Sequence, residues 1–135
     1  PVPTPGPEQA TRIVIPAIDV DHPVVEGDDW EALKRGVGHT PWSANPGQVG
    51  NCVLSAHNDI FGEIFRRLPE MELGDEIFIH TSTQVYKYVV KATRIIEPTQ
   101  VEVMYPTSRP VVTLISCYPY LVDNKRVVVI AELEP

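Results

Sequence analysis

Proline is the residue that most constrains how this chain can fold. The 135 residues include 14 prolines, which are spread along the whole chain rather than gathered in one segment. A proline inside a helix removes a backbone hydrogen bond and clashes with the preceding turn, so this spacing excludes long helices. The sequence therefore predicts a fold built from short segments.

Between the prolines, short runs of β-branched and aromatic residues bounded by turn residues predict strands. The runs at 111–116 and 126–131 are almost entirely apolar, which predicts central strands buried on both faces. Segments 28–34 and 60–68 carry helical signals. Six or more short strands favour a closed or sandwiched all-β fold. The expected strands are Arg12–Ile15, Cys52–Ser55, Glu76–His80, Val85–Ile96, Val111–Ser116 and Arg126–Ala131.

Length and composition limit the possible functions. The length fits one domain, and 43% hydrophobic with 21% charged residues predicts a globular chain. The net charge of -7 argues against a nucleic-acid partner, which needs a basic surface. No apolar run is long enough to span a membrane, and no signal peptide is recognisable. The start, PVPTPGPEQ, predicts an extended linker, so we interpret residues 1–10 as a Pro-rich linker remnant and 11–135 as one domain. We expect a further segment before it in the full-length protein.

The chain has two cysteines, Cys52 and Cys117. Cys117 ends the apolar run TLIS and is followed by Tyr-Pro-Tyr. A free cysteine is most often a small buried hydrophobic residue. A cysteine at a strand end can also be a nucleophile when a base lies nearby. One disulfide between the two cysteines is a third possibility, and the residues alone leave all three open.

Four histidines are candidates for that base. His57 and His80 each end a predicted strand, which favours them without separating them. His39 lies in a predicted loop, and His22 lies beside two acidic residues, Asp19 and Asp21, in what we interpret as a solvated turn. For each of them a satisfied structural histidine is the simpler alternative.

Arg126 begins the last predicted strand. If 111–116 and 126–131 pair as antiparallel neighbours, Arg126 lies near Cys117, where its guanidinium can stabilise an oxyanion. An ordinary strand-end ion pair is the alternative. The sequence has no CxxC, HExxH or P-loop pattern, so no metal or other cofactor is expected. The acidic residues at 19, 21, 28 and 29 lack EF-hand spacing, and calcium dependence stays open.

Three longer stretches resemble one family. VVTLISCYPY followed by KRVVVIAEL is similar to the end of a sortase domain, with its nucleophile strand and later arginine. GVGHTPWSANPGQVGNCVLSAH and FRRLPEMELGDEIFI resemble the sortase segments around the active-site histidine and the strand that follows. The resemblance extends over residues 11–132 and is greatest to class D or class E sortases.

This resemblance implies a closed eight-stranded β-barrel with short helices. It also implies three catalytic and three substrate-binding residues. Ser116 stands where the family often has threonine, and serine retains the hydroxyl group. Ala56 stands where glycine is common. The implied residues are Cys117, His57 and Arg126 for catalysis, and Ser116, Ala56 and Tyr118 for substrate binding.

The implied activity is that of a cysteine transpeptidase. Such an enzyme cleaves an LPxTG-like sorting signal after threonine through a thioester and transfers the acyl group to an amine. The implied partners are secreted proteins with a sorting signal and an amine of a peptidoglycan precursor or pilin. The implied location is the extracytoplasmic face of the cell membrane, with attachment only through an N-terminal anchor. A peptidase that only hydrolyses and a non-catalytic β-barrel binding module are the alternatives.

Cys52 lies five residues before His57. In an extended strand an odd offset places two side chains on opposite faces. If His57 faces a groove, Cys52 faces away from it. We therefore expect Cys52 to be a buried free thiol that does not pair with Cys117.

Overall fold

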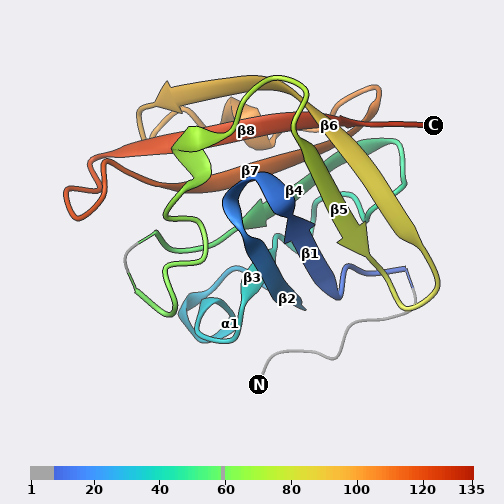
Figure 1. The fold of residues 1–135 in the computed structure, drawn as a ribbon, viewed down its shortest axis with the longest axis horizontal. Helices are drawn as coiled ribbons and strands as arrows, with labels where there is room; N and C mark the ends of the chain where they lie inside the picture. Colours follow the sequence, from blue (N-terminus) through green and yellow to red (C-terminus); the bar gives the residue numbers. More distant parts are fainter. Residues whose placement is uncertain (1–7, 59) are drawn as a thin grey trace.

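The computed structural model describes residues 8–58 and 60–135, so most of the predicted linker lies outside the described residues. Eight strands form a closed barrel in the order β1-β2-β3-β4-β7-β8-β6-β5 (Figure 1). This confirms the expected all-β barrel with short helices. The strands are β1 (Arg12–Ile15), β2 (Val20–Glu26), β3 (Val37–His39), β4 (Gly50–Ser55), β5 (Glu76–His80), β6 (Val85–Ile96), β7 (Pro110–Tyr118) and β8 (Lys125–Leu133).

Every strand expected from the sequence is present, and β7 and β8 extend beyond the predicted ends. The sequence missed β2 and β3. β2 contains Pro23, which pairs with Arg12 of β1, so a residue that usually marks a turn lies inside a strand here. His22 belongs to this strand, and its interpretation as a turn residue was wrong. β3 has only three residues, one of them Gly38, which is too short for a strand pattern.

The helices are few and short. α1 (Trp30–Leu33) lies within the predicted segment 28–34, and the Asp29 side chain caps it by accepting a 2.8 Å hydrogen bond from the Ala32 backbone N–H. The expected helix over 60–68 is wrong. Phe61 and Glu63 have positive φ angles of 51° and 54°, which an α-helix excludes. This part of the chain forms turns, and η2 (Leu68–Glu70) follows; η1 (Pro16–Ile18) and η3 (Val101–Met104) are equally short.

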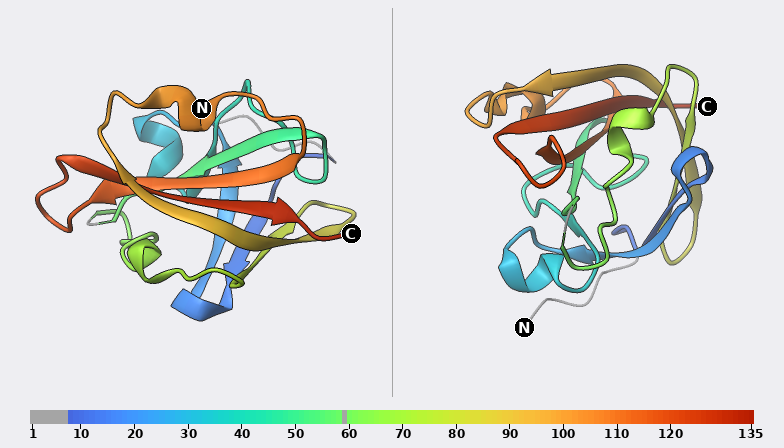
Figure 2. Two further views of the ribbon diagram at one scale, coloured as in Figure 1. Left: turned by 90° about the horizontal axis from the view of Figure 1, so that it is seen from above. Right: turned by 60° about the vertical axis from the view of Figure 1, so that its left-hand side comes forward.

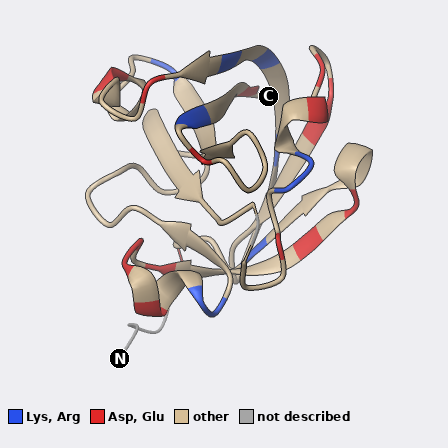
Figure 3. Cartoon of the chain, turned by 90° about the vertical axis from the view of Figure 1, so that its left-hand side faces the viewer, with Lys and Arg blue, Asp and Glu red and all other residues tan. Residues whose placement is uncertain are grey.

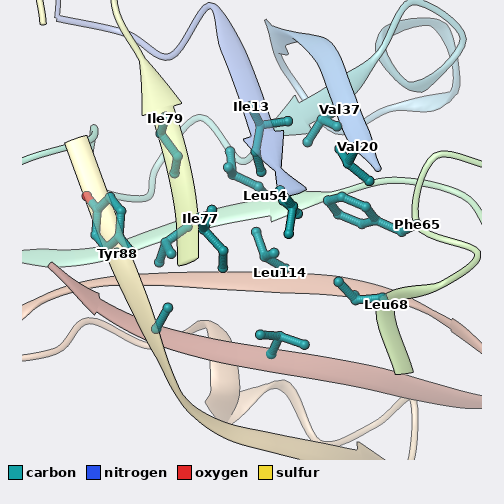
Figure 4. Close-up of a cluster of buried hydrophobic side chains, with 14 of the residues drawn as sticks. Ile13, Val20, Val37, Leu54, Phe65, Leu68, Ile77, Ile79, Tyr88 and Leu114 are labelled. Atoms are coloured by element: carbon teal, nitrogen blue, oxygen red, sulfur yellow. The ribbon is translucent and has the colours of Figure 1, made fainter. Parts of the chain in front are cut away.

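Apolar side chains from every side of the barrel fill its interior (Figure 4). The Phe65 side chain comes from the loop between β4 and β5 and is fully buried against this core. Tyr88 is the largest buried side chain, and its hydroxyl accepts a 2.9 Å hydrogen bond from the Gly47 N–H. This bond satisfies the one polar atom that the tyrosine brings into the core. Ala10 is also buried in this cluster, so the packed domain begins before residue 11.

A buried polar cluster lies where β2 and β3 run side by side. The Glu26 carboxylate contacts Nδ1 of His39, and Nε2 of His39 lies 2.8 Å from the Ala44 carbonyl and 3.1 Å from the Ser43 hydroxyl. A glutamate, a histidine and a serine in a row resemble the composition of a catalytic triad. Ser43, however, donates its proton to the Thr40 carbonyl, so this hydroxyl is committed to the loop. The cluster is structural.

The pairing of β4 with its neighbours prepares the candidate site. β4 runs parallel to β7 and in register from Gly50 opposite Pro110 to Ser55 opposite Ile115. β7 in turn pairs antiparallel with β8. The three strands lie side by side in both views of Figure 2. The loops that follow β4 and β7, together with α1, gather at one end of the barrel (Figure 1).

Candidate active site

Strand register brings the three predicted catalytic residues together. Cys117 of β7 lies directly opposite Arg126 of β8. On the other side of β7, the last pair with β4 is Ser55 opposite Ile115. His57 follows Ser55 by two residues, as Cys117 follows Ile115, so His57 is level with Cys117. The expected antiparallel pairing of the last two strands is confirmed.

The same three residues share one face of the sheet. Side chains alternate between the two faces of a strand. On all three strands the neighbouring positions that belong to the interior cluster alternate with the candidate residues, so the candidate side chains point out of the barrel. The interior positions are Leu54 and Ala56 on β4 and just after it, Leu114 on β7, and Val127 and Val129 on β8.

Two aromatic rings hold His57. Its ring centroid lies 5.8 Å from that of Trp30 and 5.4 Å from that of Phe61, both edge-on, and those two rings are 5.1 Å apart. Nε2 of His57 is buried and has no hydrogen-bond partner among the described residues. The ring is therefore oriented by packing rather than by a hydrogen bond at Nε2. Sequence reasoning missed both aromatic residues: Trp30 comes from α1, far from His57 in the chain, and Phe61 lies in the segment that was wrongly expected to be helical.

Arg126 is oriented by backbone carbonyls. Its Nη1 donates to the carbonyl of Lys125 at 2.8 Å and to that of Asp123 at 3.3 Å. Within residues 8–58 and 60–135 it forms no salt bridge, so the strand-end ion pair considered from the sequence is not what the structure contains. A guanidinium without a carboxylate partner, next to a cysteine, has donors left for an anion.

The remaining predicted site residues lie differently. Ser116 and Ala56 are 3% and 5% exposed, and the Ser116 hydroxyl donates to the Ala56 carbonyl at 2.8 Å. Both side chains face the interior, on the opposite side of the sheet from Cys117, and substrate contact by either residue stays a prediction. Tyr118 is half-buried and packs against the core. Substrate contact by Tyr118 stays a prediction.

Sequence reasoning also missed Asn58. Its Nδ2 donates to the carbonyl of Cys117 at 2.8 Å and to the carboxylate of Asp123 at 3.1 Å. Asn58 follows His57 directly, and Asp123 lies in the loop between β7 and β8. A single amide thus joins the loops of the candidate site. The only signal in the sequence was adjacency to the histidine.

The other cysteine and histidines lie elsewhere. Cys52 is 1% exposed and forms no disulfide with Cys117, which confirms the expected buried thiol. Burial raises the pKa of the Cys52 thiol, and the nearby Glu26 carboxylate raises it further. His39 is held inside the barrel, and His22 and His80 belong to strands that do not pair with β7. His57 is therefore the histidine next to Cys117.

The four clustered aspartates have protein partners. Asp21 pairs with Arg12, Asp19 with Arg67, Asp28 accepts from Thr40, and Asp29 caps α1. In the described part of the chain, no group of three or more His, Cys, Asp or Glu side chains is arranged to hold a metal ion. Figure 3 looks directly at the end of the barrel that carries the site and shows acidic and basic segments interspersed.

No helix among the described residues combines the length and hydropathy needed to cross a bilayer.

The chain is similar to known proteins in both sequence and structure. The sortase domain family model matches residues 13–134. Sortase D of Bacillus subtilis is 34% identical over 114 residues, which cover 83% of this chain and 56% of that protein. A Streptomyces coelicolor protein named sortase SrtE1 is 30% identical over 131 residues, covering 85% of this chain and 37% of that protein. The chain thus spans about half the length, or less, of the curated relatives it matches.

Solved structures agree with these matches. Sortase C-1 from Actinomyces oris superposes with a TM-score of 0.88 at 32% identity and covers 93% of this chain and 73% of that one. A Clostridium perfringens sortase D5 transpeptidase gives a TM-score of 0.86 at 28% identity, covering 94% and 79%. The matches include several sortase classes, so the choice of class D or E stays a prediction. With its sequence matched from residue 13 to 134 and its barrel matched throughout, the chain belongs to the sortase family.

Proposed function

We propose that this chain is the catalytic domain of a cysteine transpeptidase that cleaves an LPxTG-like sorting signal and transfers the acyl group to an amine. One observation carries the proposal. Cys117 lies on β7, Arg126 on the neighbouring β8, and His57 two residues after the end of β4; the three are level with one another and point to the same face of the sheet. Acyl transfer requires a nucleophile, a group that carries protons, and a hydrogen-bond donor that stabilises the oxyanion. Cys117, His57 and Arg126 supply these functions in that order.

In the acylation step, the Cys117 thiolate attacks the carbonyl carbon of the threonine that precedes the scissile bond. The carbonyl oxygen becomes an oxyanion beside the Arg126 guanidinium, which has no carboxylate partner among the described residues. The C–N bond then breaks, and the departing amine takes a proton from His57. A thioester on Cys117 and a free amine are the products.

In the transfer step, an incoming amine attacks the thioester carbonyl and gives its proton to His57. The C–S bond breaks, the Cys117 thiolate returns, and a new amide remains. Thiolate is a good leaving group, which allows an amine to resolve the intermediate. The packing of Trp30 and Phe61 on the His57 ring supports this role by limiting the orientations that the ring can take.

The proposed substrates follow from the family. The acyl donor is a secreted protein with a C-terminal sorting signal, and the acceptor is an amine of a peptidoglycan precursor or pilin. Leu121 and Val122 at the tip of the loop between β7 and β8 are 70% and 63% exposed, which supports contact of this loop with an apolar peptide. We place the enzyme at the extracytoplasmic face of the membrane.

Incubation of the protein with an LPxTG-like peptide and glycine amide tests the proposal, with products identified by mass spectrometry. A new amide that disappears in Cys117→Ala and persists in Cys52→Ala is the expected result, and Cys52 is the matched control because it is the other thiol. Cleavage without transfer contradicts transpeptidation and favours a peptidase. No reaction across several sorting peptides contradicts both and favours a binding module.

A further inference from the structure

Asn58 is a polar side chain that the proposed chemistry does not use. It is 3% exposed, although asparagine belongs to the residues that usually lie at the surface. Burial of an amide is costly unless its hydrogen bonds are made. The NH₂ group of Asn58 makes two hydrogen bonds, whereas its Oδ1 is buried without a partner among the described residues, so the NH₂ group is what accounts for the buried side chain.

The two acceptors fix the orientation of the Asn58 amide. The Cys117 carbonyl and the Asp123 carboxylate can only accept hydrogen bonds, so the NH₂ group must face both of them. Both bonds have ordinary lengths, 2.8 and 3.1 Å. The side chain is thus held at one rotamer between the end of β7 and the loop that follows it.

Asp123 continues the connection to the arginine. Its backbone carbonyl accepts from Nη1 of Arg126 at 3.3 Å, and its backbone N–H donates to the Pro119 carbonyl at 2.8 Å. The side chain of Asn58 therefore links the residue after His57 to the backbone of Cys117 and, through Asp123, to the Arg126 guanidinium. The Asn58 residue is therefore connected, directly or through Asp123, to all three proposed catalytic residues.

A second contact joins the same two loops at the surface. The Tyr120 hydroxyl donates to the Glu63 carboxylate, and the Arg66 guanidinium lies 4.1 Å from the centroid of the Tyr120 ring. This contact is independent of Asn58. Loss of the Asn58 amide is therefore expected to leave the loops docked but to free the position of His57 relative to Cys117.

We propose that Asn58 is a positioning residue, which sets His57 against Cys117 through the Cys117 carbonyl and sets Arg126 through Asp123. The inference rests on the proposed function for its kinetic readout but not for its thiol readout. A misplacement of about 1 Å at a reacting group costs about 100-fold in rate. Asn58→Ala is accordingly expected to lower the acylation rate by about 10- to 100-fold with little change in KM.

The test compares Asn58→Ala, Asp123→Ala and a matched control, Asn51→Ala. Asn51 is also a buried asparagine near β7; its Nδ2 donates to the backbone carbonyls of Val103 and Tyr105, and its Oδ1 accepts from the Thr113 hydroxyl at 2.6 Å. The control therefore removes three hydrogen bonds at the far end of β4, one more than Asn58→Ala removes at the site. Folding is checked by circular dichroism, and melting temperatures are measured for all variants.

The first readout is the pH dependence of Cys117 alkylation by iodoacetamide, followed by peptide mass. We expect the profile to shift in Asn58→Ala and Asp123→Ala and to keep its wild-type midpoint in Asn51→Ala, even where the melting temperatures fall equally. Equal alkylation profiles in all four proteins overturn the proposal, because a purely structural role lowers stability without changing the pH dependence of Cys117 alkylation. Asp123→Ala keeps the test decisive if Asn58→Ala does not fold.

The second readout is acyl-enzyme formation with an LPxTG-like peptide. Wild-type acylation together with wild-type kcat in Asn58→Ala overturns the positioning role and leaves the proposed function standing. Absence of acylation in the wild type overturns the proposed function, and the alkylation profiles then decide on Asn58 alone. A fall in kcat that Asn58→Gln partly restores, because it keeps the amide donor, supports the positioning role.

Discussion

Replacing His39 with leucine removes a buried imidazole whose two nitrogens both face acceptors. Nδ1 contacts the Glu26 carboxylate, and Nε2 lies 2.8 Å from the Ala44 carbonyl. The side chains of His39 and Glu26 are 1% and 9% exposed. In His39→Leu the carboxylate and the carbonyl both lose their partner, and no water replaces them easily at that depth.

The loss of stability in His39→Leu follows from the Glu26 carboxylate, which stays buried without its partner. Removal of one member of a buried ion pair typically destabilises a protein by about 3–5 kcal/mol. Glu26→Gln is the informative comparison. A glutamine NH₂ can donate to Nδ1 of a neutral His39, whose Nε2–H still donates to Ala44, so every buried group keeps a partner. We expect Glu26→Gln to cost less than about 1.5 kcal/mol, the range of one ordinary hydrogen bond.

Urea unfolding at pH 7, monitored by tryptophan fluorescence, measures both changes. With a shift of about 3 °C for each kcal/mol in a domain of this size, His39→Leu is also expected to lower Tm by about 10–15 °C. A Glu26→Gln variant as unstable as His39→Leu would refute the reasoning, because it would mean that the charge, rather than the set of satisfied hydrogen bonds, stabilises the cluster. A loss below about 1 kcal/mol in His39→Leu would refute the burial cost itself.

Three further predictions concern other parts of the barrel. Arg126→Lys should lower kcat/KM by at least about 10-fold in the peptide assay, because lysine lacks the fork of donors, and full activity in Arg126→Ala would contradict the oxyanion role. Cys52 should resist iodoacetamide in the folded protein at pH 8 while Cys117 reacts, because burial raises the pKa of the Cys52 thiol. Because the pKa of the Cys52 thiol is higher in the folded than in the unfolded chain, its contribution to the free energy of unfolding is complete below about pH 8.5 and declines as the pH rises further. Urea titrations of wild type and Cys52→Ala at pH 8 and 10 should therefore show a smaller decline in the free energy of unfolding in the variant. Gly47→Ala should destabilise the protein by more than about 1 kcal/mol, because Gly47 has a φ angle of 83° and an added Cβ overlaps the Tyr86 ring; an unchanged urea midpoint would contradict this.

The sequence predicted the strands that carry strong local patterns. β6 and the two apolar strands β7 and β8 have composition and length that only a sheet accommodates. β2 was not predicted because Pro23 and its acidic neighbours resemble a turn. Only the pairing with β1 makes these residues a strand. The helix predicted over 60–68 was wrong for the opposite reason. Ile60, Ile64 and Leu68 have helical spacing, but Gly62 and the positive φ angles on either side of it bend the chain into turns.

The candidate site shows a similar division. Position at a strand end made Cys117 a candidate nucleophile and narrowed the histidines to two, and the family resemblance assigned the nucleophile role to Cys117 and the base role to His57. The interior direction of Ser116 followed from the barrel and could not be read from the pattern, since 111–116 is apolar on both faces. Trp30 and Asn58 were missed because their roles depend on contacts between distant segments, for which a single sequence holds no signal.

The parallel pairing of β4 with β7 has a consequence for when activity can arise. The hydrogen bond from Ser116 to Ala56 closes a separation of 60 positions, and the strand between His57 and Arg126 is the one that brings them together. Pairings across such separations carry a large loop-closure entropy and form slowly. A partly folded chain therefore has a cysteine but no assembled site. The juxtaposition of Cys117 and His57 thus reports complete folding of the barrel, and it distinguishes fully folded chains from partly folded ones.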